Sequence, residues 1–318
     1  MGNQEIKPKN LNAKKWSDII FYACFAALPL LQYAIFYVAV NANSIALAFQ
    51  KYEIDGLSYK YVFYGFGNFK QVLVDLFSEP TMLRTLRNSA VAYLSGLLIT
   101  TPLALFFSYY IMKKFTGSGF FRVILFIPTI VCSIISLFIF KLLFDNIIPE
   151  IIEKLFYSNG GFEKEKWLFL TNIETRFDIL VFYSVFVGFG TNVLLYTGAM
   201  SGVDTSMVEA AQLDGVSDFQ EFIYIIFPVV YPTLVTFCTV GVGSFFTSQL
   251  FIYDIYADRG DPYIWTLGYY MYKSTVSGEG RFELYPYLSA MGLIFTLIAF
   301  PISLTVRRVM EKIGPSEE

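Results

Sequence analysis

The sequence predicts an all-α integral membrane protein with six membrane-spanning helices. The 318 residues are 55% hydrophobic and only 15% charged, and the mean hydropathy of +0.54 is too high for an ordinary soluble domain. Runs of about 20 apolar residues cross a bilayer as helices, and regular ten-residue alternation, the mark of a β-barrel, is absent. Six runs lack Asp, Glu, Lys and Arg: 19–50, 88–112, 123–140, 179–203, 222–253 and 284–306.

The first run is predicted to remain in the mature protein. It is too long for the apolar part of a signal peptide, and no small-residue cleavage site follows it. The sequence therefore divides into an N-terminal tail over 1–18, one membrane domain over 19–306 and a C-terminal tail over 307–318.

Basic residues predict that both tails lie in the cytoplasm. Under this orientation the inner segments carry basic residues close to helix ends. The remaining basic residues are spread through three longer outer segments, where they have less influence on membrane orientation. The inner basic residues are Lys7, Lys9, Lys14, Lys15, Lys113, Lys114, Arg122, Arg307, Arg308 and Lys312.

The segment between the fourth and fifth runs is acidic. From Asp204 to Asp258 the chain has no Lys or Arg, while Asp204, Glu209, Asp214, Asp218 and Glu221 carry negative charge. An acidic loop beside an anionic inner leaflet would be repelled. We therefore expect this loop, which we call the elbow (204–228), to face a protein.

Catalysis by this chain is not predicted. It has no histidine, and Cys24, Cys132 and Cys238 lie in three different runs, as small core residues do. No Gly-Lys pair exists, so there is no Walker A loop for ATP, and we expect neither a metal nor a bound cofactor. The runs contain no ionisable residue for proton coupling, although sodium coupling through backbone carbonyls stays open.

The elbow is predicted to form two short helices. Ser206 with Glu209 and Ser217 with Gln220 have the spacing of capping boxes at helix starts. Gly215 between them can take the left-handed conformation that ends a helix.

The first elbow helix is predicted to present a surface of small side chains that allows another protein to approach closely. These residues are Val208, Ala210 and Ala211. After the second helix, Pro228 and Pro232 would kink or start the next span. The alternative is a plain inter-helix loop with no partner.

The elbow resembles the EAA loop of ABC importer permeases. The matching residues are Glu209-Ala210-Ala211, then Gly215, Ile225 and Pro228 at the family spacing, with Asp214, which is common in the carbohydrate branch. Phe227 replaces the usual Leu. The resemblance implies a type I importer permease whose Glu209, Ala210, Ala211, Asp214 and Gly215 form a coupling helix seated in a cytoplasmic ATPase.

The resemblance to maltose-type and glycerol-phosphate-type sugar permeases extends over about 65–310. Further matching stretches are Gly67-Asn68-Phe69, Leu86-Arg87-Asn88-Ser89 and Phe121-Arg122 leading to Ile127-Pro128. The chain has Arg259-Gly260-Asp261-Pro262 where many members of the family have a Gly-Gly-Pro turn.

The resemblance implies partners and a place in the cell. The partners are a second, homologous permease subunit, two cytoplasmic ATPase subunits that use ATP and Mg²⁺, and an extracellular binding protein that delivers an oligosaccharide. The membrane would be the cytoplasmic membrane of a bacterium or archaeon. The alternatives are an importer for a polyol phosphate, amino acid or peptide, and a sodium-coupled secondary transporter or channel.

The fourth and fifth runs contain polar residues away from their ends, as expected for a sugar path through an apolar cavity. Equivalent stretches line the cavity in the maltose-type relatives, although the partner subunit alone can hold the sugar. The alternative is hydrogen bonding between helices. The candidates are Thr191, Asn192, Tyr196, Ser244, Thr247, Ser248, Gln249 and Tyr253.

An amphipathic outer segment covers 146–157 and has Pro149 near its start. Its apolar and charged residues alternate at helical spacing. It either lies on the membrane surface or docks the binding protein.

Overall fold

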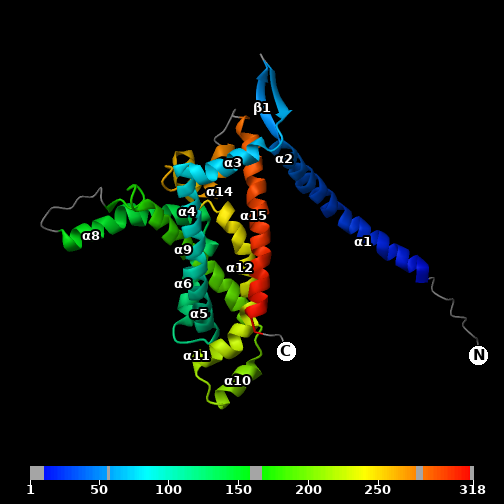
Figure 1. Cartoon of the computed structure of the whole chain (residues 1–318). Helices are drawn as coiled ribbons and strands as arrows, with labels where there is room; N and C mark the ends of the chain where they lie inside the picture. Colours follow the sequence, from blue (N-terminus) through cyan, green and yellow to red (C-terminus); the bar gives the residue numbers. More distant parts are fainter. Residues whose placement is uncertain (1–10, 56–57, 158–166, 277–281, 316–318) are drawn as a thin grey trace, which may run out of the picture.

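The computed structural model describes residues 11–55, 58–157, 167–276 and 282–315. Parts of both predicted tails, 1–10 and 316–318, lie outside these ranges. The described helices form an elongated bundle from which two helical arms depart (Figure 1). The prediction of an all-α membrane protein is confirmed at this level.

The bundle is built from long helices and their π-helical continuations. They are α4 (Pro80–Ser95), η2 (Gly96–Thr100), α5 (Thr101–Met112), α6 (Ser118–Ile130), α9 (Arg176–Met200), η5 (Phe222–Ile226), α12 (Phe227–Thr247) and α15 (Leu284–Ile313).

Five segments of the described chain are long and apolar enough to cross a membrane, and they correspond to five of the six predicted runs. They are Ile19–Ala48, Pro80–Met112, Arg176–Met200, Asp218–Arg259 and Leu284–Ile313.

The sixth predicted span, 123–140, is not one helix. Helix α6 ends at Ile130, Val131 and Cys132 are extended (ψ 137° and 132°), and α7 (Ser133–Leu142) begins after them. The break comes within the β-branched residues Thr129, Ile130 and Val131, which have low helix propensity. The prediction of six continuous spanning helices is therefore confirmed for five.

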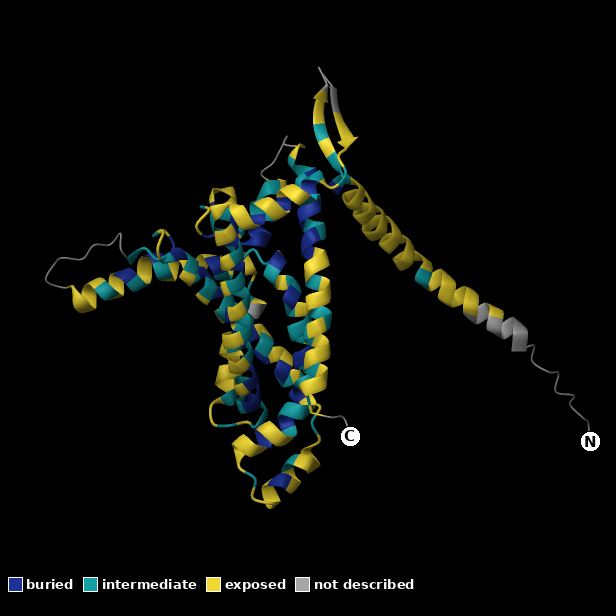
Figure 2. Ribbon diagram, in the orientation of Figure 1, coloured by how far each residue is buried: buried dark blue, intermediate teal, exposed yellow. Residues whose placement is uncertain are grey.

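The N-terminal arm leaves the bundle. It consists of α1 (Leu11–Tyr33), η1 (Ala34–Ala39) and α2 (Val40–Ala48). Only its end packs inside the chain, where α2 contacts α15. None of its most apolar window is buried within the described chain (Figure 2). This arm is suited to lipid or to another membrane subunit.

A β-hairpin follows the N-terminal arm and was not predicted. Strand β1 (Gln50–Asp55) pairs antiparallel with β2 (Ser58–Phe63), and Gln50 lies opposite Phe63. The hairpin marks one end of the bundle, opposite the elbow (Figure 1).

Asn68 and Asn88 lie in the stretches that resemble the sugar permeases, and their side chains form hydrogen bonds at the hairpin end of the bundle. Asn68, on α3 (Gly67–Ser78), donates to the carbonyls of Ala48 and Gln50 at 2.9 and 2.7 Å. Asn88 donates to the carbonyls of Tyr263 and Trp265 at 2.8 and 3.0 Å. Each amide thus joins segments that are distant in sequence.

The predicted fifth run does not stay helical to its end. Helix α12 ends at Thr247, and Leu250 and Phe251 have positive φ angles of 49° and 56°. Thr266 donates to the freed carbonyl of Ser248 at 2.7 Å. Three shorter helices follow: α13 (Ile252–Tyr256), the 3₁₀ turn η6 (Ala257–Arg259) and α14 (Leu267–Val276).

The second arm contains the predicted amphipathic segment. Helix α7 continues through η3 (Leu143–Ile147) into α8 (Ile148–Phe156), which points away from the bundle (Figure 1). Pro149 is buried in the first turn of α8, whereas Leu155 and Phe156 are exposed. No described residue therefore covers the apolar side chains at the end of α8.

Candidate functional site

The elbow folds into two short helices, as predicted, at the end of the bundle opposite the hairpin. They are α10 (Thr205–Leu213) and α11 (Asp218–Glu221), and η5 and α12 continue directly from α11. Inside the bundle the elbow rests on a cluster of buried side chains from α5, α9, η5 and α12, which includes Tyr109, Val193, Tyr196, Phe222 and Ile226.

Helix α10 begins differently from the prediction. Its N-cap is Asp204, whose carboxylate accepts a hydrogen bond from the Ser206 amide at 2.9 Å. This hydrogen bond holds the pKa of the Asp204 carboxyl below its ordinary value. Ser206 is thus inside the first turn, and the predicted capping box of Ser206 with Glu209 is wrong. Asp204, two residues before Ser206, caps the helix in its place through the Ser206 amide.

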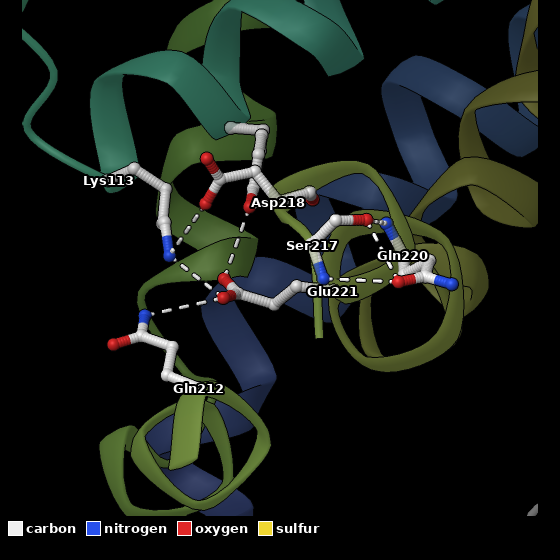
Figure 3. Close-up of polar contacts among 7 residues, drawn as sticks. Lys113, Gln212, Ser217, Asp218, Gln220 and Glu221 are labelled. Atoms are coloured by element: carbon white, nitrogen blue, oxygen red, sulfur yellow. Dashed lines mark hydrogen bonds and ion pairs between the residues drawn. The ribbon is translucent and has the colours of Figure 1, made fainter. Parts of the chain in front are cut away.

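The turn between the two helices agrees with the prediction. Gly215 has a φ of +76°, and Val216 donates to the carbonyl of Ala211 at 3.1 Å, which closes the end of α10. Ser217 and Gln220 form the predicted capping box at the start of α11 (Figure 3).

The small side chains of α10 do not all face outward. Glu209, Ala210, Asp214 and Gly215 are exposed, but Ala211 is only 8% exposed. Val208 also packs against the buried cluster beneath the elbow. The expectation of an outward surface built from Val208, Ala210 and Ala211 is therefore wrong for two of the three. An α10 that is anchored on the bundle must turn one face inward.

A buried polar junction fixes the elbow to the bundle (Figure 3). Glu221 is 1% exposed, and its carboxylate lies 2.8 Å from Nζ of Lys113, the C-cap residue directly after α5. Lys113 also lies 3.4 Å from Oδ1 of Asp218. Tyr109 donates to the Asp218 carbonyl at 2.9 Å and to Glu221 Oε1 at 3.2 Å. Gln212 of α10 donates to Glu221 Oε2 at 3.4 Å.

The junction joins three elements through one carboxylate. Glu221 binds α5 through Lys113, binds α10 through Gln212 and itself sits at the start of the fifth span. A buried ion pair adds little net stability, but removing one partner is costly. The arrangement therefore links the position of α10 to the positions of α5 and α12.

Sequence reasoning counted Lys113 and Glu221 only as loop charges. One signal was present: Lys113 directly follows the run 88–112, and Glu221 directly precedes the run 222–253. Opposite charges at the facing ends of two predicted spans are candidates for an ion pair.

A cavity of about 410 Å³ lies between the middle parts of three spans. Its walls come from α4, η2 and α5, from α9 and from α12. Four of the eight predicted path residues line it: Asn192, Tyr196, Ser244 and Ser248.

The other four path residues lie elsewhere. Thr191 and Thr247 are exposed and donate to carbonyls of their own helices, those of Val187 and Gly243. Gln249 and Tyr253 lie beyond the end of α12, outside this cavity. The early end of α12 at Thr247 places both residues beyond the helix that lines this cavity.

The cavity has a wall that sequence reasoning missed. Tyr93, Thr100 and Thr101 of the second span face it, together with Gly96. The predicted path considered only the two spans beside the elbow.

Comparison with known proteins gives a consistent picture. Residues 96–316 match the family model described as "Binding-protein-dependent transport system inner membrane component". The chain is 22% identical over 305 residues to the arabinooligosaccharides transport system permease protein AraP of Bacillus subtilis, with 93% of this chain and 92% of the relative covered. It is 26% identical over 250 residues to the sn-glycerol-3-phosphate transport system permease protein UgpA of Yersinia pestis, with 77% and 80% covered.

A solved structure shares the fold. The chain superposes on a bacterial ABC transporter involved in the import of the acidic polysaccharide alginate, with a TM-score of 0.74, 18% identity, and 95% of this chain and 100% of that chain covered.

Proposed function

Because the chain belongs to the family of inner membrane components of binding-protein-dependent transport systems, we propose that it is the permease subunit of an ATP-driven importer for a carbohydrate. The preferred cargo is an oligosaccharide delivered by an extracellular binding protein. As the multi-pass membrane component of an ABC importer, the chain is not itself the catalytic subunit.

The proposed assembly contains a second, homologous permease subunit and two cytoplasmic ATPase subunits, which bind and use ATP and Mg²⁺. Both termini lie in the cytoplasm of a bacterial or archaeal cell. The exposed N-terminal arm supports a further membrane partner, because an apolar helix of this length needs lipid or protein around it.

The observation that carries the proposal is the construction of the elbow. Helix α10 lies at the tip of the molecule (Figure 1), and α10 together with the turn after it exposes Glu209, Ala210, Asp214 and Gly215. Glu221 holds the base of α10 through the buried junction. A free loop needs no such support. An ATPase that grips α10 and closes on ATP would push α10 and, through Glu221, the cytoplasmic end of α5.

The test replaces Gly215 in the complete importer reconstituted in liposomes. No other atom lies within 4 Å of a Cβ added at Gly215, so a substitution acts only through the backbone. Gly215→Val should be strained by roughly 1–2 kcal/mol and lose most sugar-stimulated ATP hydrolysis. Gly215→Asn is the matched control, since Asn tolerates the left-handed conformation.

Measuring the amount of protein in the membrane separates a loss of sugar-stimulated ATP hydrolysis from a loss of folding. Both variants should reach the membrane in normal amounts. Wild-type stimulation in Gly215→Val, with normal assembly, would show that the elbow is an ordinary loop and would favour a transporter that works without an ATPase.

The carbohydrate assignment is supported by the relatives that are named for arabinooligosaccharide transport. Importers for a polyol phosphate, which the relatives named for sn-glycerol-3-phosphate transport favour, and importers for an amino acid or a peptide remain the competing class. Uptake of a labelled peptide in place of any sugar by the same reconstituted complex would decide for that class.

A further inference from the structure

The apolar face of the β-hairpin is largely uncovered by the described chain. Side chains of a strand alternate between its two faces, and the observed register places Tyr52 and Ile54 of β1 on the same face as Tyr61 and Phe63 of β2. Ile54 is 66% exposed and Phe63 is 79% exposed. We call these four residues the hairpin face. Aromatic and aliphatic side chains that gather on one exposed face are typical of the centre of a protein interface.

The hairpin face is held firmly on the bundle. The rings of Tyr52 and Tyr61 lie 5.4 Å apart, and the Tyr61 hydroxyl donates to the carbonyl of Phe282 at 3.3 Å. At the base of the hairpin, the Tyr64 amide donates to the carbonyl of Phe49 at 2.7 Å. A two-stranded sheet alone is only marginally stable, so these contacts fix its position. A surface that is already ordered loses little conformational entropy when it binds.

A protein outside the membrane fits this face better than lipid does. The described sheet has two strands, so each strand has an open edge. Open sheet edges do not occur in the hydrocarbon of a bilayer, because their backbone groups would lack hydrogen-bond partners. The hairpin also projects beyond the start of α15, roughly along the long axis of the bundle (Figure 1). A second membrane subunit would lie beside the bundle, whereas a soluble protein can lie on its end.

A cavity of about 370 Å³ beside the hairpin gives the rim of this surface an acidic character. It lies between β1, α3 and the start of α15. The charged groups in its described lining are the carboxylates of Asp75, Glu79 and Glu283 and the ammonium of Lys51. Lys51 also lies 3.5 Å from the carboxylate of Glu53. The negative charge therefore dominates, and it favours a partner that carries basic side chains around its apolar contact.

We infer that the hairpin face docks the extracellular binding protein, and that the docked surface of that protein is apolar at its centre and basic at its rim. The inference rests on the proposed function, which places the hairpin end outside the cell. It goes beyond that function by naming the docking element and the chemistry of the partner surface.

The first experiment measures docking directly. The complete importer, with both permease subunits and the ATPases, is placed in nanodiscs, and surface plasmon resonance gives the dissociation constant of its own purified, sugar-loaded binding protein. The double variant Ile54→Thr with Phe63→Thr removes apolar contact area and introduces β-branched residues that suit a strand. Its dissociation constant should rise by about tenfold or more, as for the loss of interface anchors. Basal ATP hydrolysis should be unchanged, which shows an intact complex.

Helix α8 supplies the matched control. Leu155 and Phe156 are also large, apolar and exposed, and α8 is the other candidate for docking the binding protein. The double variant Leu155→Gln with Phe156→Gln should bind as tightly as wild type. Loss of binding in this variant, with wild-type binding in the hairpin variant, would move docking to α8 and overturn the inference.

The second experiment tests the acidic rim. Glu79→Gln with Glu283→Gln should lower the association rate at low ionic strength by about twofold or more and weaken its dependence on salt, because rim charges steer the encounter. Glu150→Gln with Glu153→Gln changes two exposed carboxylates of α8 and should leave the rate unchanged. An association rate equal to wild type in both variants would overturn the assignment of a basic partner surface.

Other occupants of the hairpin face give different results. If the face packs on the second permease subunit, the hairpin variant should lose that subunit during purification, and this result would overturn the inference. Wild-type affinity in the hairpin variant, with an intact complex, would do the same. A wild-type importer that neither binds the binding protein nor hydrolyses ATP faster in its presence would contradict the proposed function, and the inference with it.

Discussion

At the scale of single residues, Glu221 and Lys113 are the pair on which the elbow depends. Their side chains are 1% and 12% exposed. Glu221→Gln removes the nearer and buried carboxylate partner of Lys113 and leaves only the exposed Asp218 at 3.4 Å, so it should destabilise the assembled complex by about 3 kcal/mol. Thermal unfolding of the purified complex measures this loss.

The double variant Lys113→Met with Glu221→Leu separates stability from position. Removing both charges should restore most of the stability. Sugar-stimulated ATP hydrolysis should stay low in the double variant, because an apolar contact does not hold α10 in one position. The comparison variant Lys114→Met changes an exposed neighbour. Single variants as stable as wild type would show that the junction is not a tight pair.

A second residue-scale prediction compares two amides. Both were candidates for the sugar path, but Asn192 lines the cavity and Gln249 lies beyond the end of α12. Asn192→Leu should lower sugar uptake by about tenfold while leaving assembly and basal ATP hydrolysis intact. Gln249→Leu should lower uptake much less. Equal uptake in wild type and both variants would place the sugar contacts on the partner subunit.

At the scale of elements, α10 presents one acidic and exposed face. Glu209 stands on that face, and no basic residue occurs from Asp204 to Asp258. Glu209→Lys should reverse the charge offered to the ATPase and reduce sugar-stimulated ATP hydrolysis by more than half, whereas Glu209→Gln should have a smaller effect. Glu174→Lys changes an exposed carboxylate at another place and serves as the control. Equal hydrolysis in Glu209→Lys and Glu174→Lys would contradict a role for this face.

Element boundaries explain most of the errors in the sequence interpretation. A charge-free run shows where a chain can be buried in lipid but not where its helix is interrupted. The run 123–140 breaks at Val131 and Cys132, and the run 222–253 ends its helix at Thr247. Both breaks lie inside charge-free sequence. At the second one, Thr266 bonds to the freed Ser248 carbonyl, a contact that only the folded chain can supply.

At the scale of the whole molecule, the segments predicted to lie inside gather at one end. Lys113, the elbow and the end of α15 meet there, and the hairpin lies at the other end (Figure 1). In a chain whose three cysteines are replaced by alanine, Thr116→Cys should react with an impermeant thiol reagent only in inside-out vesicles. Lys60→Cys should react only in intact cells. The reverse pattern would invert the orientation, and labelling of both from one side would exclude this topology.

The sequence by itself determined the membrane class, five of the spans, the helix–turn–helix elbow with its left-handed Gly215, and the resemblance to importer permeases. These features depend on local composition and on spacing within about twenty residues. Apolar length decides whether a segment enters lipid, and a glycine between two caps decides where a short helix ends.

Only the tertiary structure decided which residues meet. The Lys113–Glu221 pair joins residues 108 positions apart, and the cavity joins Thr100 to Asn192 and Ser244 from three spans. The sequence could not place Gln249 outside the cavity, which depends on where α12 ends, or Ala211 inward, which depends on how α10 rotates against the bundle. That rotation is set by the packing of the whole bundle, which no local pattern encodes.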